Sequence, residues 1–140
     1  MEPITIEITI LKPVAEVWDY FTKPEHITKW NFSNDQWESP SAENDLRVGG
    51  SFNYRMEQKD DEYGFNSRGI YDEIIPHQKI QYHFEDGRKV EVFFESLEGN
   101  MTRVTQVFEP DPEQPAQMQR DGWYGILDNF HKYAENNVAG

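Results

Sequence analysis

The sequence predicts an α+β fold in which an antiparallel sheet packs against one long carboxy-terminal helix. Apolar and polar residues alternate at the start of the chain and again in several segments between residues 52 and 108, as they do in strands with one buried face. Turn-forming residues separate these segments. The last apolar pattern, from about Gln114 to Asn137, instead repeats every three or four residues and so indicates an amphipathic helix.

The first third of the chain predicts a strand, two short helices and a loop. Isoleucine occupies every second position from Ile4 to Ile10, which indicates a strand with one buried face. Pro13 and Pro24 then each open a short helix, because the N–H that proline lacks has no helical partner at that position. Segment 31–44 is polar, and we expect a loop there that could include a short edge strand.

The middle of the chain predicts strands joined by tight turns. Turn signals are found at residues 49–50, 58–62, 76–78, 85–87 and 98–100. Strands are expected between them, at residues 52–56, 63–75, 80–84, 90–95 and 103–108. Because the connections are tight, these strands should be antiparallel neighbours. Gly69 lies inside one of them and indicates a bulge or a close approach of a neighbouring group.

The final helix should cover the sheet. Its apolar stripe consists of Trp123, Ile126, Leu127, Phe130, Tyr133 and Ala134. One face of the sheet must be covered, and this helix is the only predicted element long enough to do it. Gly122 and Gly125 each cost about 1 kcal/mol relative to alanine in a helix interior. Space beside the helix and close packing are both physical reasons for keeping them.

The composition narrows the class of protein. A length of 140 residues suits one domain, and four Trp, seven Tyr and nine Phe give it a bulky core. A net charge of −13 argues against binding to nucleic acid or to anionic membranes, both of which need a basic surface. The amino terminus lacks a signal-peptide pattern, and no apolar run approaches membrane-spanning length. We therefore expect a cytoplasmic protein.

The sequence supports neither a metal site nor a nucleophile. It has no cysteine, no Gly-x-Ser-x-Gly motif and no phosphate-binding glycine loop. Its histidines are isolated from one another at His26, His77, His83 and His131. We therefore predict no metal, no cofactor and no assigned catalytic residue. The one alternative is acid–base chemistry at Asp72 or Glu73, since burial near aromatic side chains would raise the pKa of a carboxyl group.

Aromatic side chains gather on the predicted inner face. The candidate ligand-binding residues are Trp18, Trp30, Phe52, Tyr54, Met56, Phe65, Tyr71, Tyr82, Phe84, Phe94, Gln106, Phe108, Trp123, Leu127 and Phe130. Apolar walls with a few polar tips are typical of small-molecule cavities. The Tyr hydroxyls and the Gln106 amide need partners if they are buried, and a ligand or trapped water could supply them. A dry aromatic core is the alternative interpretation.

Several motifs, taken together and in order, resemble those of a known family. They are residues 13–21 followed by Pro24-Glu25 and Trp30, 45–50 followed by Phe52, Tyr54 and Met56, 69–74 followed by Pro76 and 80–82, 102–105, and Gly122-Trp123 with Leu127. The chain resembles the small single-domain relatives of the activator of the heat-shock protein 90 ATPase, in the superfamily of START-type and birch-pollen-allergen-like (SRPBCC) domains. The resemblance implies one START-like domain over residues 1–140, with a helix-grip fold and a cavity between the curved sheet and the final helix.

Three functions remain as hypotheses. The first is non-catalytic binding of a small hydrophobic or amphipathic molecule, such as a lipid, a polyketide or an aromatic metabolite. The second, implied by the family and compatible with the acidic surface, is a chaperone-associated interaction module. The third is a cyclase or hydrolase that uses Asp72 or Glu73, as some members of the superfamily have become enzymes. Fold alone does not decide among them.

Overall fold

The computed structural model of the chain describes residues 2–60 and 63–136. The elements in these residues are β1 (Ile4–Ile10), α1 (Val14–Thr22), α2 (Pro24–Ile27), β2 (Trp37–Asn44), β3 (Ser51–Gln58), β4 (Gly64–Ile75), β5 (Lys79–Phe84), β6 (Lys89–Leu97), β7 (Met101–Phe108) and α3 (Ala116–Asn136). The α+β prediction is confirmed. Residues 61–62 of the turn predicted at 58–62, and the predicted helix end at Asn137, lie outside the described residues.

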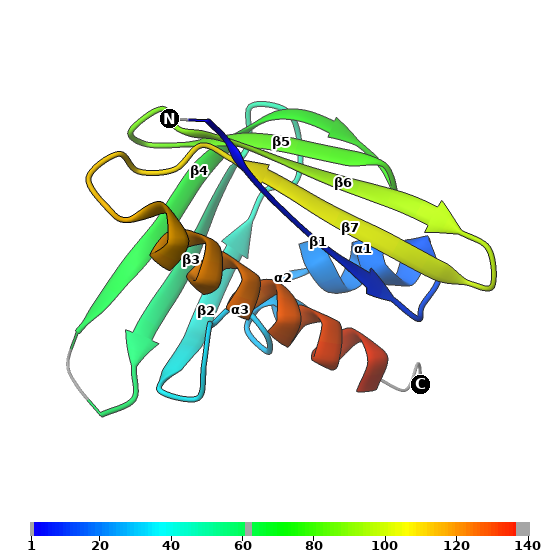
Figure 1. Cartoon of the computed structure of the whole chain (residues 1–140), viewed down its shortest axis with the longest axis horizontal. Coiled ribbons are helices and arrows are strands. Elements are labelled where there is room, and N and C mark those ends of the chain that lie inside the picture. Colours follow the sequence, from blue (N-terminus) through cyan, green and yellow to red (C-terminus); the bar gives the residue numbers. More distant parts are fainter. Residues whose placement is uncertain (1, 61–62, 137–140) are drawn as a thin grey trace.

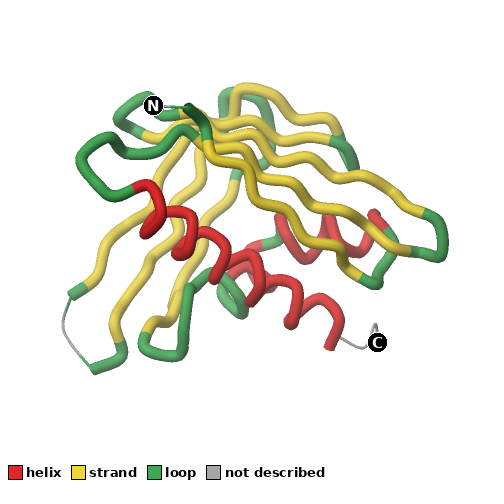
Figure 2. The backbone as a smooth tube through the Cα atoms, in the orientation of Figure 1, coloured by secondary structure: helices red, strands yellow, loops and turns green. Residues whose placement is uncertain are grey.

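The strands form one antiparallel sheet that curves around α3 (Figure 1). Its order is β1-β7-β6-β5-β4-β3-β2, so every pair of neighbours from β2 to β7 is a hairpin and β1 returns to pair with β7. That pairing places Ile4 opposite Phe108 and Ile10 opposite Thr102. Figure 2 shows the sheet as a half-barrel, with α3 in its concave side. This is the helix-grip architecture.

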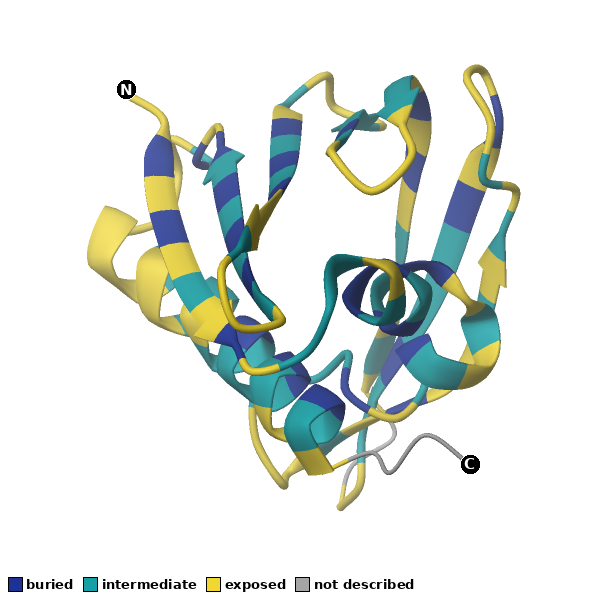
Figure 3. Cartoon of the chain, turned by 90° about the vertical axis from the view of Figure 1, so that its right-hand side faces the viewer, coloured by how far each residue is buried: buried dark blue, intermediate teal, exposed yellow. Residues whose placement is uncertain are grey.

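The buried stripe of α3 is confirmed. Leu127, Phe130 and Ala134 are fully or almost fully buried, while the other members of the stripe pack against the core from its edge. The Phe130 ring meets the Trp30 ring edge-on, with 4.8 Å between centroids. Buried and exposed residues alternate along β1, as the banding in Figure 3 shows. The core therefore lies between this helix and the inner face of the sheet.

The expectation that α3 alone covers the sheet is wrong. Helix α1 also packs on it, because its aromatic side chains are long enough to reach β6. The Trp18 ring lies edge-on to Phe94 with 5.0 Å between centroids. Phe21 makes similar contacts with Phe94 and Phe130, at 5.4 and 5.3 Å. One end of the concave face is therefore filled by α1 and the other is left to α3.

Segment 31–44 contains both the loop and the edge strand that the sequence allowed for. Residues 37–44 form β2, an eight-residue strand at the edge of the sheet. Its pairing with β3 shifts between Glu38 and Ser41, around Pro40. An edge strand tolerates proline because one side of its backbone needs no partner. Much of β2 is exposed, so it lacks the apolar alternation by which strands are recognised.

Gly69 allows a close approach, which was one of the two expectations for it. Gly69 on β4 pairs with Phe52 on β3. A Cβ at position 69 would lie 2.5 Å from the Phe52 ring, which covers the glycine. The irregularity of β4 falls further along, where the pairing with β5 shifts between Tyr71 and Glu73.

Candidate functional site

A cavity of about 670 Å³ lies between the curved sheet and the helices. This volume falls within the range of about 300–1,000 Å³ that is usual for small-molecule sites. Its walls come from the inner face of β3, β4, β5 and β7, from the end of α1 and from α3. Ten of the residues predicted from the sequence line it: Trp30, Phe52, Tyr54, Met56, Phe65, Tyr71, Tyr82, Phe84, Gln106 and Trp123.

The other five predicted residues do not line this cavity. Trp18, Phe94, Phe108, Leu127 and Phe130 are buried in the core. Two of them lie where α1 closes the sheet, since Trp18 packs on Phe94. Phe108 is covered by Trp123, whose ring stacks on it at 4.1 Å with an angle of 7°. The inner face is thus part dry core and part hollow, and the ten residues around the hollow stay candidates for ligand binding.

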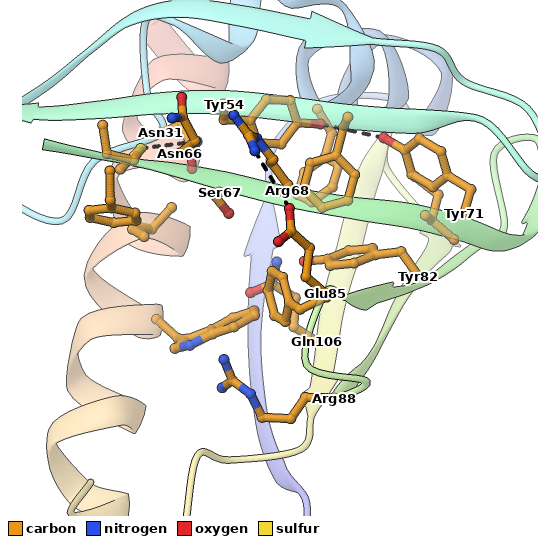
Figure 4. Close-up of a pocket in the computed structure, with 18 of the residues that line it drawn as sticks. Asn31, Tyr54, Asn66, Ser67, Arg68, Tyr71, Tyr82, Glu85, Arg88 and Gln106 are labelled. Atoms are coloured by element: carbon orange, nitrogen blue, oxygen red, sulfur yellow. Dashed lines mark hydrogen bonds and ion pairs between the residues drawn. The ribbon is translucent and has the colours of Figure 1, made fainter. Parts of the chain in front are cut away.

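A hydrogen-bonded chain of side chains lies along one side of the cavity, and Figure 4 shows its Tyr54–Tyr71 contact. Tyr71 donates its hydroxyl to Asn44 Oδ1 at 2.5 Å, and the Tyr54 hydroxyl lies 3.4 Å from the Tyr71 hydroxyl. Asn44 Nδ2 in turn donates to the Thr22 carbonyl at 2.6 Å. Burial raises the pKa of Tyr54, and it raises the pKa of Tyr71 to about 12. Both hydroxyls therefore stay protonated and uncharged at neutral pH.

Two further polar groups face the cavity without a partner. The Gln106 amide and the Tyr82 hydroxyl point into the hollow in Figure 4, and neither makes a hydrogen bond to any residue that the structure describes. Gln106 is only 8% exposed. Burial raises the pKa of Tyr82, so this hydroxyl is also neutral. The polar atoms of both groups are open to the cavity and not sealed in the core, so water or a bound molecule can serve as their hydrogen-bond partner.

The charged lining residues lie at the mouth of the cavity. They are Arg68 on β4 and residues 85, 86 and 88 in and after the turn that follows β5. Arg68 Nη1 lies 3.8 Å from Glu85 Oε1, and Arg88 Nε lies 2.7 Å from Asp86 Oδ2. The Arg88 guanidinium also lies over the Phe84 ring, 5.2 Å from its centroid. Each arginine is therefore paired with a carboxylate, and the four charges sum to zero.

Comparison with known proteins shows which family has this architecture. The model of the family described as Activator of Hsp90 ATPase homolog 1-like protein (AHSA1) matches residues 12–135. The chain belongs to this family. The resemblance predicted from the ordered motifs is therefore confirmed, and so is the helix-grip fold that it implied.

Solved structures of AHSA1-like and other bacterial proteins share the fold. The AHSA1-like protein of Aeromonas hydrophila is 30% identical, with 98% of this chain and 99% of that chain covered and a TM-score of 0.85. A protein of Cytophaga hutchinsonii is 38% identical over 96% and 93% of the two chains, with a TM-score of 0.82. A protein of Chromobacterium violaceum, 21% identical over 98% and 100%, has a TM-score of 0.86 and shows the fold alone. A comparison with curated proteins found no match.

Sequence reasoning missed about half of the lining of this AHSA1-like cavity. The additional residues are Phe21, Thr22, Asn31, Asn66, Ser67, Arg68, Ile80, Glu85, Asp86, Arg88 and Ile126. Ile80 and Ile126 could have been found, because they share an alternation or a stripe with residues that were predicted. Glu85, Asp86 and Arg88 could not, because a turn after a strand gives no sign of whether it bends over the concave face.

The two carboxylates proposed for acid–base chemistry lie away from the AHSA1-like cavity. Asp72 Oδ2 lies 2.9 Å from His83 Nδ1, and Glu73 Oε1 lies 2.6 Å from Lys79 Nζ. Both pairs are on the outer face of the sheet. The shift in pairing between Tyr71 and Glu73 inserts one extra residue, which turns both carboxylates outward. The geometry therefore gives no support to a cyclase or hydrolase that uses them.

Neither a cluster of metal-binding side chains nor a membrane-spanning helix is found in residues 2–60 and 63–136. No group of three or more histidine, aspartate or glutamate side chains there is placed to hold a metal ion. None of the helices in these residues is both long enough and apolar enough to cross a membrane.

Proposed function

We propose that this protein binds a small hydrophobic or amphipathic molecule in the cavity beneath α3 and does not transform it. One observation carries the proposal: the hollow is walled by aromatic side chains, yet it contains the unpartnered Gln106 amide and Tyr82 hydroxyl. A solid core would have filled the space or satisfied these groups. The family supports a START-like binding domain.

The walls suit a ligand that contains rings. Phe52 and Tyr54 are stacked with 4.7 Å between centroids, and Trp123 meets Phe84 edge-on at 6.2 Å. Aromatic side chains bind other rings by such offset and edge-on contacts. Burying about 200 Å² of apolar ligand surface would contribute roughly 5 kcal/mol before the entropic cost of association.

The distribution of charge supports binding without catalysis. Acid–base catalysis needs an ionisable group within hydrogen-bond reach of the reacting atom. The carboxylates that line the cavity, Glu85 and Asp86, are at its mouth and are engaged by Arg68 and Arg88. Further in, the polar lining consists of neutral hydroxyl and amide groups.

Native mass spectrometry of protein isolated from its own host tests the proposal. We expect a non-covalent adduct of the wild-type chain that is lost in Ser67→Phe, because Ser67 lines the cavity on β4 and a ring there fills it. Ser51→Phe is the matched control, since Ser51 is exposed on the outer side of β3 and does not line the cavity. Absence of any adduct, together with no thermal shift from a panel of lipids and polycyclic compounds, would contradict the proposal.

A second candidate is association with a chaperone, which the family description favours. An aromatic cluster at the surface consists of the half-buried Trp37 and the exposed Tyr63 and Phe65. The ring centroid of Trp37 lies 5.8 Å from that of Phe65 and 6.0 Å from that of Tyr63. Such a cluster is a plausible anchor for a protein partner. Stimulation of heat-shock protein 90 ATPase turnover by the wild-type chain, and its loss in Trp37→Ala, would support this function. No stimulation at saturating protein would contradict chaperone association.

For either function we propose a cytoplasmic location.

A further inference from the structure

We propose that the cavity selects uncharged, ring-containing molecules that carry a hydroxyl or carbonyl at their inner end. Molecules that would place a carboxylate or an ammonium group there are rejected. The inference rests on the proposed binding function and narrows it to a class of ligand. The observation behind it is that charged side chains lie at the mouth of the cavity and neutral polar side chains lie in its interior.

Polar side chains are sorted by depth. The charged ones, Arg68, Glu85 and Arg88 among them, are at the mouth, where Arg68 and Glu85 are exposed. The Tyr82 hydroxyl and the Gln106 amide lie inside and have no partner among the described residues. An amide and a phenol can each donate and accept, so together they suit a ligand hydroxyl or a ligand carbonyl.

Sheet curvature brings the two inner groups to one place. Tyr82 is on β5 and Gln106 is on β7, and β6 separates these strands. Tyr82 pairs with Val90 and Gln106 with Val92, which are two residues apart on the inner face of β6. Both side chains therefore stand on the concave side of three adjacent strands. In Figure 4 the Tyr82 ring and the Gln106 amide converge on the same part of the hollow.

A charged group would be poorly solvated beside them. No lysine, arginine, histidine, aspartate or glutamate lines the inner part of the cavity within the described residues, so an ion there has no counter-charge. Desolvation of an ion is repaid only by a close opposite charge with good geometry. The tyrosines do not provide one, because burial raises the pKa of Tyr54, Tyr71 and Tyr82 and keeps them neutral. The arginines at the mouth are already paired.

Four rigid probes of one shape test this selectivity by isothermal titration calorimetry at pH 7. They are fluorene, 9-fluorenone, fluorene-9-carboxylate and protonated 9-aminofluorene. We expect fluorene to bind, and fluorenone to bind about tenfold more tightly, as one or two neutral hydrogen bonds allow. The carboxylate and the ammonium probe should bind at least tenfold more weakly than fluorene.

Two variants locate the effect. In Gln106→Leu and in Tyr82→Phe the ratio of the affinity for fluorenone to the affinity for fluorene should fall by about fivefold. Gln81→Leu and Tyr63→Phe are matched controls that should keep the preference, because neither Gln81 nor Tyr63 lines the cavity. The ligand series itself needs no variant, so the test does not depend on the folding of any one of them.

The outcomes separate the two proposals. If none of the four probes binds and none shifts the melting temperature, the proposed binding function fails and this inference fails with it. If fluorene binds but fluorenone gains nothing, or if either ion binds more tightly than fluorene, the cavity binds ligands and the selectivity inference is overturned.

Discussion

Tyr71 shows how a single buried hydroxyl joins several elements at the edge of the cavity. Tyr71 lies on β4 and donates its hydroxyl proton to Asn44 at the end of β2. The hydroxyl of Tyr54, on β3, lies close to the Tyr71 hydroxyl. Asn44 extends the chain to the carbonyl of Thr22, the last residue of α1. Three strands and a helix therefore meet through neutral groups. Such a network is stabilising only while every member stays protonated and paired.

Alkaline unfolding tests the role of Tyr71. Burial raises the pKa of Tyr71 from 10.0 to about 12, so its stabilising effect is complete below pH 10 and is lost as pH rises through 12. At pH 11 the loss should be about 1 kcal/mol relative to pH 8. The free energy of unfolding, measured in urea at both pH values, should therefore fall by about 1 kcal/mol less in Tyr71→Phe than in wild type. Tyr63→Phe, which changes an exposed ring, should behave as wild type. Equal falls in all three proteins would contradict the assignment.

The sequence predicted a structural role for Gly69 but did not decide which of two roles it has. Its position within a strand indicated a bulge or a close contact, and the contact turned out to be the Phe52 ring. The bulge is at Asp72 instead, where nothing in the sequence marks it. Backbone irregularities of this kind depend on how the sheet must bend, so a local pattern does not reveal them.

At the scale of elements, the two glycines of α3 do different things. A Cβ at Gly122 would meet no atom within 4 Å. A Cβ at Gly125 would lie 3.0 Å from the carbonyl oxygen of Ser33, in the segment between α2 and β2. The sequence left open space and close packing as alternative reasons for these glycines. Gly122 has open space beside it, and Gly125 packs closely against Ser33.

A pair of alanine variants measures this difference. Gly122→Ala should stabilise the protein by about 1 kcal/mol, because alanine has the higher helix propensity and the new methyl group is free of contacts. Gly125→Ala should gain much less or lose stability, since the added methyl group presses on the Ser33 backbone. Urea unfolding of the two variants beside wild type gives both values. Equal stabilisation by both would show that α3 does not pack on this segment.

A second pair of variants compares an aromatic residue of the core with one that lines the cavity. Phe130 is fully buried against Phe21 and Trp30, so Phe130→Ala should cost about 3–5 kcal/mol. Phe65 lines the cavity and is 42% exposed, so Phe65→Ala should cost less than about 1 kcal/mol. Thermal and urea unfolding give the comparison. A larger loss from the Phe65 variant would reverse the division of the concave face.

At the scale of the whole molecule, periodicity predicted most of the fold. The strands at residues 4–10, 52–56 and 80–84 were evident because each buries one face, and α3 because its stripe is wide. The edge strand within residues 31–44 was predicted without bounds, because an exposed edge strand such as β2 needs no apolar alternation. The contribution of α1 to covering the sheet was not predicted, because only the length of each helix was considered. Trp18 and Phe21 of this short helix contact the sheet through their aromatic rings.

The candidate site was predicted only as a set of inward-facing residues. Alternation tells which residues face the concave side, but it does not tell where a neighbouring element fills that side. Phe84 and Phe94 follow the same pattern, yet Phe84 lines the cavity and Phe94 is packed under α1. The charged mouth depends on the course of a turn. The aromatic residues of the inner strand faces were therefore accessible from the sequence, and the charged residues of the turn after β5 were not.

The net charge of −13 leads to a prediction about the molecule as a whole. Folding brings these charges closer together, so their repulsion destabilises the folded state at low ionic strength. The ion pairs within the described residues join side chains that are at least partly exposed, and salt weakens such pairs by only a few tenths of a kcal/mol each. Repulsion should therefore outweigh attraction.

We accordingly expect the melting temperature to rise by about 3–5 °C between 10 and 200 mM sodium chloride. Over this interval the screening length falls from about 30 Å to below about 10 Å, which removes most long-range repulsion between surface carboxylates. A gain of about 1 kcal/mol corresponds to that shift for a domain of this size. Potassium chloride should act equally, because screening depends on ionic strength and not on the cation. A melting temperature that falls with salt would show that paired charges, such as those at the mouth of the cavity, stabilise the fold more than the excess of carboxylates destabilises it.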